Sequence, residues 1–158
     1  KVPEPLIQKQ FSRIMSLKDG MKKMSKSDPS DLSRINLRDE KDEIYNKIKK
    51  AKTDTMPMPT DIKDLVKRPE AENLLGIYSS LRNQKLENSI NYFNGKQFSE
   101  FKEKLSEALI EKIEPLSKEI KKLLNDEKYL DEVLLKGSEK ADKIASKKIK
   151  EIKKLVGF

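Results

Sequence analysis

The chain has 158 residues, of which 39% are charged and 35% hydrophobic, so its core must be thin relative to its surface. This balance favours an elongated helical array over a compact sheet protein. The absence of cysteine and histidine excludes thiolate nucleophiles, disulfides, zinc fingers and histidine acid–base catalysis within the chain. The formal net charge of +8 favours a polyanionic partner, although surplus lysine also serves as a solubilising surface.

The sequence carries no apolar run long enough to cross a bilayer and no signal-peptide core after Lys1. We therefore expect a cytoplasmic protein without a membrane partner, and the lack of cysteine fits a reducing compartment. The chain does not begin with methionine. We expect it to be a piece of a larger protein.

One short strand is predicted over residues 13 to 17, ended by the turn dipeptide Asp19-Gly20. No partner strand of comparable strength follows, and a lone strand is not stable in water. We therefore expect this strand to lie at the edge of a sheet that is built mainly by residues upstream of Lys1.

The most distinctive stretch is the pentapeptide Lys23 to Ser27, which contains two ammonium groups and two hydroxyls. Asp19-Gly20 precedes it, and glycine tolerates positive φ. Asp28-Pro29 follows it, and proline forces the preceding residue out of the helical region. These neighbours predict an exposed, hinged loop outside any helix or strand. Cations on such a loop suit closure over a polyphosphate, where they neutralise charge as a bond to phosphorus breaks.

Helical signals dominate the rest of the chain. After an extended connector, a helix is predicted from an Asp39 N-cap, with Asp42 completing a weak capping box, to about Ala51. Its lysines, Lys47 included, are expected to lie largely outside. The proline-containing residues 53 to 69 are predicted to form a linker. Two helices should follow, over 69–83 and 85–93, the second stopped by Asn94-Gly95.

From residue 97 onward, apolar residues recur at spacings of three and four, which predicts long helices in an antiparallel bundle. Pro115 predicts a kink or a break, and Gly137 a further interruption. In the last helix a lysine row lies opposite the apolar row. Its members are Lys136, Lys140, Lys143, Lys147, Lys150 and Lys154. Two interpretations stay open for this row: contact with RNA phosphates, or a plain solvent-exposed face.

The pentapeptide resembles the KMSKS signature of the class I aminoacyl-tRNA synthetases. Further stretches resemble the C-terminal half of bacterial-type tryptophanyl-tRNA synthetases. They are residues 16–29, 39–54, 73–79, 95–98 and 137–146. The resemblance covers nearly the whole chain. It implies a mainly α structure, in which the edge of a Rossmann-type catalytic domain, to about residue 30, precedes an antiparallel helical bundle.

The resemblance also implies a division of labour along the chain. Residues 1–38 would be the C-terminal edge of the catalytic nucleotide-binding domain with the KMSKS loop. Residues 39–158 would be the α-helical, anticodon-binding domain. In that family ATP activates L-tryptophan to tryptophanyl-adenylate, and the aminoacyl group then passes to tRNA(Trp).

Carried onto this chain, the resemblance makes Lys23 and Lys26 the catalytic cations, with Lys26 as the direct partner of the leaving pyrophosphate. The ATP-binding residues would be Lys23, Met24, Ser25, Lys26 and Ser27. ATP would enter with Mg²⁺ as substrate, with no metal ligand and no tightly bound cofactor in this chain. Lysines of the last helix would contact tRNA, namely Lys140, Lys143, Lys147, Lys150 and Lys154.

The chain departs from the family pattern in two respects. The proline-rich residues 53 to 69 differ from the family pattern and are assigned no role, and the family's HIGH-type sequence needs histidine, whereas this chain has none. The tryptophan pocket and the main contact of the expected homodimer would therefore belong to the missing N-terminal half, and we expect this chain alone to be inactive in adenylate formation. Three alternatives stay open. They are the corresponding part of a tyrosyl-tRNA synthetase, a non-catalytic helical RNA-binding module, and a structural helical adaptor.

Overall fold

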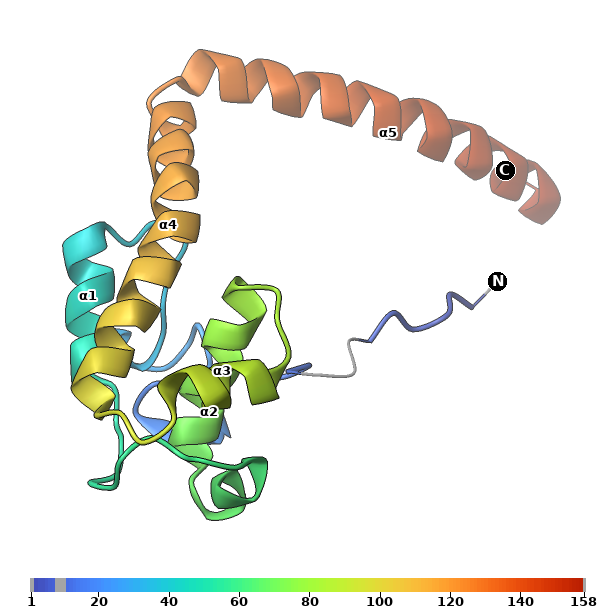
Figure 1. The fold of residues 1–158 in the computed structure, drawn as a ribbon. Coiled ribbons are helices and arrows are strands. Elements are labelled where there is room, and N and C mark those ends of the chain that lie inside the picture. The colour runs from blue at the N-terminus through green and yellow to red at the C-terminus, as the bar shows by residue number, and fades with distance from the viewer. Residues whose placement is uncertain (1, 8–10, 158) are drawn as a thin grey trace. The chain divides into compact units, whose positions relative to one another are not determined.

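The structure is a computed structural model that describes residues 2–7 and 11–157. In chain order the elements are β1 (Met15–Ser16), β2 (Asp19–Lys23), the 3-10 helix η1 (Asp31–Ser33), α1 (Lys41–Lys50), the 3-10 helix η2 (Ile62–Lys67), α2 (Pro69–Leu81), α3 (Leu86–Phe93), α4 (Phe98–Leu124) and α5 (Glu127–Val156) (Figure 1). The prediction of a mainly α protein is confirmed. The chain divides into two compact units, one ending at Ser117 and the other beginning at Lys118.

The predicted strand has a partner, so the prediction of a lone strand ended by Asp19-Gly20 is wrong. β1 pairs antiparallel with β2, and the turn between them lies at Leu17 and Lys18. Asp19 and Gly20 instead begin β2, where the Asp19 carboxylate accepts a hydrogen bond from the N–H of Met21 at 3.0 Å. The Asp-Gly pair is typical of hairpin turns, and this misplaced the turn by two residues.

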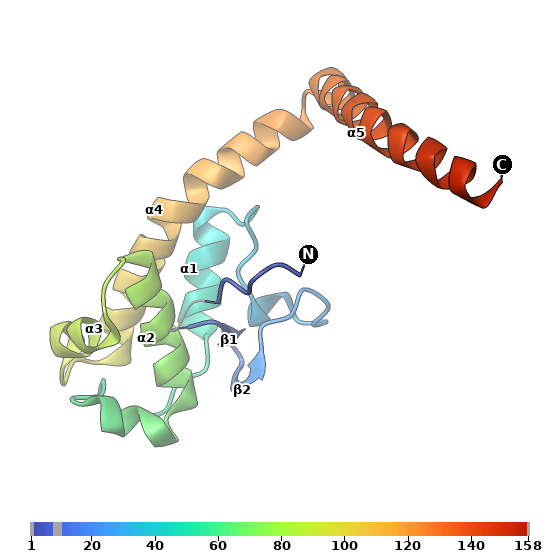
Figure 2. The ribbon, with the colours of Figure 1, turned by 90° about the vertical axis from the view of Figure 1, so that its right-hand side faces the viewer.

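The hairpin is fixed on the first turns of α2. An added Cβ on Gly20 would lie 2.6 Å from backbone atoms of Pro69 and Glu70, so close approach, and not a positive φ, explains the glycine. The Asn73 amide brackets β1, accepting from the N–H of Met15 at 2.8 Å and donating to its carbonyl at 2.9 Å. Figure 2 shows the hairpin between α2 and the loop that leads to α1.

Helix α1 begins one residue later than the sequence predicts. Glu40 is its N-cap, and the N–H of Glu40 donates to the Glu43 carboxylate at 2.7 Å, closing a capping box one position beyond the Asp39 and Asp42 pair. Asp39 is buried and serves a different purpose, because the ammonium group of Lys47 donates to it. The prediction that Lys47 lies outside is therefore wrong.

Residues 53 to 69 are folded and do not form an open linker. They contain η2, whose N-cap Asp61 accepts from the N–H of Lys63 at 2.8 Å. Met58 and Leu65 are buried in the core. The fixed φ of the prolines thus serves a packed segment as well as it would serve a linker.

The core of the first unit lies among α1, α2, α3 and the first part of α4, which runs alongside α1 in both views (Figure 1, Figure 2). Its centre is an aromatic cluster of Tyr78, Phe93 and Phe101. Phe93 meets Tyr78 edge to face at 5.0 Å between ring centroids, and Phe101 at 4.8 Å. Such pairs add stability beyond the area they bury.

The two longest helices run without the predicted breaks. α4 continues through Pro115, which is exposed, so water can bond the carbonyl that the missing N–H leaves unpaired. α5 continues through Gly137 and ends at Gly157, which has a φ of 86°. No residue of α5 is buried within the described structure. None of the described helices is long and apolar enough to span a bilayer.

Candidate functional site

The signature loop, residues Lys23 to Ser27, leaves the hairpin directly. Lys23 is the last residue of β2, so the prediction that the pentapeptide avoids every strand fails at this residue only. Met24 is half-buried against the core, and its N–H donates to the carbonyl of Ile14 at 3.0 Å. Ser25, Lys26 and Ser27 are exposed, and a turn includes the last two. Met24 therefore anchors a short exposed turn.

Within this turn the serines bond to each other. Their hydroxyl oxygens lie 2.9 Å apart, and the N–H of Ser27 donates to the hydroxyl of Ser25 at 3.3 Å. Among the described residues, no carboxylate pairs with the ammonium group of Lys23 or of Lys26. The loop thus presents two cations whose charge is not neutralised by a described neighbour.

The chain after the turn is held by Arg34. Its Nη1 donates to the carbonyl of Asp28 at 2.9 Å and to the carbonyl of Ser30 at 3.3 Å. The Asp28 carboxylate in turn accepts from the N–H of Ser30 at 2.8 Å. These bonds fix the backbone at the C-terminal end of the signature loop.

Behind Arg34 lies a polar cluster around Lys47 of α1. The ammonium group of Lys47 is 2.7 Å from Asp31 and 2.6 Å from Asp39, and the side chain is only 4% exposed. Burial alone would lower the pKa of Lys47, but the hydrogen bonds that its ammonium group donates to both carboxylates raise that pKa. The same hydrogen bond from Lys47 has the opposite effect on its acceptor and lowers the pKa of Asp31. Arg34 joins this cluster, because its Nη2 lies 3.2 Å from Asp31.

Sequence reasoning missed Arg34, Asp31 and Lys47 as partners of the loop. Their roles depend on which side chains meet in the fold. The helical spacing of α1 separates Lys47 from Lys49 but places Lys47 on the same face as Lys50, so it does not single out Lys47. The one local signal is that Lys47 lies three residues after the core residue Ile44 and next to Ile48, both 0% exposed.

The lysines predicted to contact tRNA all lie on α5 and are exposed. They are Lys140, Lys143, Lys147, Lys150 and Lys154. The helix carries them through Gly137 unbroken, so they share one face at spacings of three and four. Their neighbour Lys148 pairs with Glu151 at 2.9 Å.

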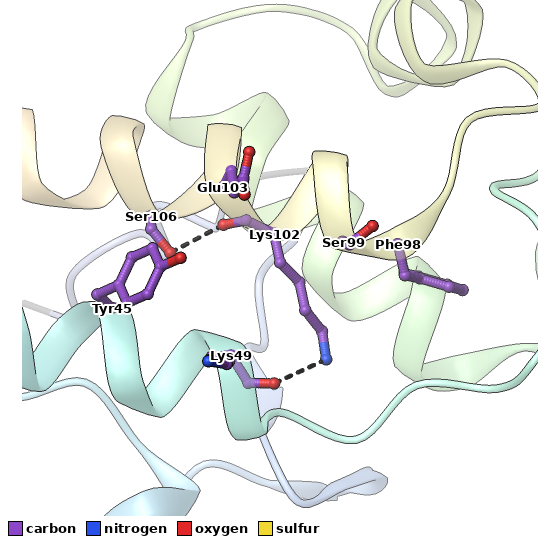
Figure 3. Close-up of a pocket in the computed structure, with 7 residues that line it drawn as sticks. All are labelled: Tyr45, Lys49, Phe98, Ser99, Lys102, Glu103 and Ser106. Atoms are coloured by element: carbon purple, nitrogen blue, oxygen red, sulfur yellow. Dashed lines mark hydrogen bonds between the residues drawn. The ribbon is translucent and has the colours of Figure 1, made fainter.

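A cavity of about 380 Å³ lies between α1 and α4 (Figure 3). Lys102 lines it and donates to the carbonyls of Lys49 at 3.2 Å and of the C-cap residue Ala51 at 2.7 Å, at the C-terminal end of α1. Burial lowers the pKa of Lys102. This lysine caps a helix end, and we assign the cavity no ligand.

No group of three or more acidic side chains in the described part of the chain is arranged to hold a metal ion. The candidate site is an exposed turn with two cations, anchored on one side by the hairpin and on the other by Arg34. Such a turn can neutralise charge on a polyphosphate, because no carboxylate among residues 2–7 and 11–157 pairs with its ammonium groups.

The sequence of the chain is similar to that of known proteins of one family. The sequence model of the family described as tRNA synthetases class I (W and Y) matches residues 1–147. The tryptophan–tRNA ligase of Agrobacterium fabrum is 49% identical over 98% of this chain and 44% of its own length. That of Rickettsia felis is 50% identical over 100% of this chain and 47% of its own length. The chain spans less than half the length of these relatives.

The fold of the chain is also similar to a solved structure. The crystal structure of tryptophanyl-tRNA synthetase from Mycoplasma pneumoniae matches 70% of this chain and 34% of its own chain, with a TM-score of 0.60 and 29% identity. Together with the family match, this similarity shows that the chain belongs to the class I tRNA synthetases (W and Y).

Proposed function

We propose that this chain is part of a tryptophan–tRNA ligase and supplies its mobile ATP and pyrophosphate loop and its tRNA-binding helices. The observation that carries the proposal is an identity of 49 to 50% with proteins of that name over nearly the whole chain. The exposed signature loop also supports the proposal, because no carboxylate of the described residues pairs with its two ammonium groups.

In the proposed first step, a carboxylate oxygen of L-tryptophan attacks the α-phosphorus of ATP. The bond from that phosphorus to the bridging oxygen breaks, and pyrophosphate leaves with the electron pair. Lys23 and Lys26 neutralise the charge that develops on the leaving group. Ser25 and Ser27 donate hydrogen bonds to phosphate oxygens, and Met24 anchors the loop. Mg²⁺ enters with the triphosphate as part of the substrate.

In the second step, a hydroxyl of the terminal tRNA ribose attacks the carbonyl carbon of the adenylate, and AMP leaves. We propose that the α5 lysines contact tRNA phosphates, which gives affinity without reading sequence. Residues 1–38 act with the catalytic domain, and residues 39–158 form the helical domain. Tryptophan binds to the part of the protein outside this chain. The full-length protein acts as a homodimer in the cytoplasm.

The test is exchange of labelled pyrophosphate into ATP by the full-length protein, with tryptophan or tyrosine as the added amino acid. The proposal predicts exchange that depends on tryptophan. Exchange that depends on tyrosine would instead assign a tyrosyl enzyme. Salt-dependent tRNA binding without exchange would assign a non-catalytic RNA-binding module, and neither activity a structural adaptor.

A further inference from the structure

We propose that Arg34, Asp31 and Lys47 form a positioning brace, which sets the C-terminal end of the signature loop during amino acid activation. This inference rests on the proposed function and adds residues outside the pentapeptide to it. The brace touches neither ATP nor tryptophan in the proposal, because it acts through the loop backbone.

The two ends of the signature loop are held in different ways. The hairpin fixes the N-terminal end: β2 pairs with β1, Gly20 packs on the α2 backbone, and the N–H of Met24 donates to Ile14 at 3.0 Å. None of the described strands pairs with the C-terminal end. There Arg34 donates to the carbonyl of Asp28 at 2.9 Å, directly after the last residue of the loop.

Arg34 is itself fixed by its neighbours. Its Nε donates to Asn36 at 3.1 Å, and its Nη2 lies 3.2 Å from Asp31. Asp31 lies 2.7 Å from Lys47, whose side chain is buried beside the fully buried Ile48 of α1. A continuous set of charge-assisted hydrogen bonds therefore joins the rigid helix α1 to the loop.

The charges of the cluster indicate that it acts through geometry. The cations Arg34 and Lys47 are balanced by the carboxylates of Asp31 and Asp39. A neutral cluster adds little field at the triphosphate, whereas Lys23 and Lys26 stay free to act on it. The brace fixes the C-terminal end of the five-residue signature loop, and the hairpin fixes the N-terminal end. Both ends therefore stay in place when the loop moves. Misplacing a catalytic group by an ångström costs about 100-fold in rate.

Two pairs of matched variants in the full-length protein test the brace. Arg34→Met removes the donors to the loop, and Arg82→Met removes a comparable arginine that pairs with Glu111 at 2.7 Å, away from the loop. Asp31→Asn breaks the link between Arg34 and Lys47, and Glu111→Gln is its control. The side chains of Asp31 and Glu111 are 57% and 55% exposed, so neither substitution should prevent folding.

The measurements are kcat and KM for tryptophan in pyrophosphate exchange, with the thermal midpoint of each variant. We expect Arg34→Met to lower kcat by about 10- to 100-fold and Asp31→Asn by about 3- to 10-fold, with the KM for tryptophan unchanged. The controls should keep the wild-type kcat. If the role of the brace is purely structural, the variants will have a lower thermal midpoint, but their kcat at temperatures below that midpoint will equal the wild-type kcat.

Wild-type kcat in both Arg34→Met and Asp31→Asn overturns the brace alone, provided that the wild-type protein shows tryptophan-dependent exchange. An equal loss in the control variants also overturns it, because the effect would then be general. Absence of exchange in the wild-type protein overturns the proposed function and the brace together.

Discussion

At the scale of single residues, the lysines on and beside the signature loop differ in their partners. Lys22 lies 3.8 Å from the Asp19 carboxylate, and Lys18 donates to the hydroxyl of Ser30 at 3.3 Å. Lys23 and Lys26 have no such partner among the described residues. An unpaired ammonium group keeps its full charge for an incoming phosphate. Lys22 is therefore a natural control for Lys26.

Gly20 offers a prediction about stability. Because an added Cβ would lie 2.6 Å from the α2 backbone, Gly20→Ala should lower the free energy of unfolding by about 1–3 kcal/mol. Gly137→Ala is the control, since its Cβ would meet nothing within 4 Å and alanine favours the helix. Urea unfolding followed by circular dichroism measures both. Equal midpoints for Gly20→Ala and the wild type would contradict the close packing.

The hydrogen bonds of Asp54 predict that the folded state loses part of its stability at low pH. Burial alone would raise its pKa, but hydrogen bonds from Arg68 and from the N–H of Met56 lower the pKa below the usual 3.8. The Asp54 carboxylate therefore binds a proton more readily in the unfolded state than in the folded state. Its ionised form stabilises the folded state above pH 3.8, and this stabilisation is lost as the pH falls below 3.8. Asp54→Asn should reduce the fall in unfolding midpoint between about pH 5 and pH 2. An unchanged fall would contradict this.

At the scale of elements, the aromatic cluster ties α2, α3 and α4 together. Phe101 is 0% exposed, so Phe101→Ala should cost about 3–5 kcal/mol of unfolding free energy through the cavity it leaves. Leu116 lies on the same helix but is 51% exposed, and Leu116→Ala should cost less than about 0.5 kcal/mol. Chemical unfolding distinguishes the two. Similar losses would mean that α4 does not pack through Phe101.

The sequence predicts these helices well because their apolar spacing and end signals are local. The start of α2 at Pro69 and the end of α3 before Asn94-Gly95 agree with the structure. The hairpin was missed because β1 has two residues, and its fixation depends on Asn73, 58 positions away. The pentapeptide was found from sequence as a motif. Arg34 and Lys47 were not, because their partners are set by tertiary contacts.

At the scale of the whole molecule, the lysine row of α5 predicts how tRNA binding depends on salt. Replacing Lys143, Lys147 and Lys150 with glutamine should reduce the slope of log affinity against log salt by about 2, if each contacts one phosphate. Filter binding of the full-length protein at several salt concentrations measures this. An unchanged slope would show that the row is only a solvent-exposed face.

The proposed function depends on the action of the signature loop on the leaving pyrophosphate. The most direct measurement is the single-turnover rate of tryptophanyl-adenylate formation by full-length Lys26→Ala, with Lys22→Ala as control. We expect Lys26→Ala to lower the rate by about 100- to 1,000-fold, with tryptophan binding intact and the control near wild type. A wild-type rate in Lys26→Ala, or a loss confined to tryptophan affinity, would contradict the role of the loop.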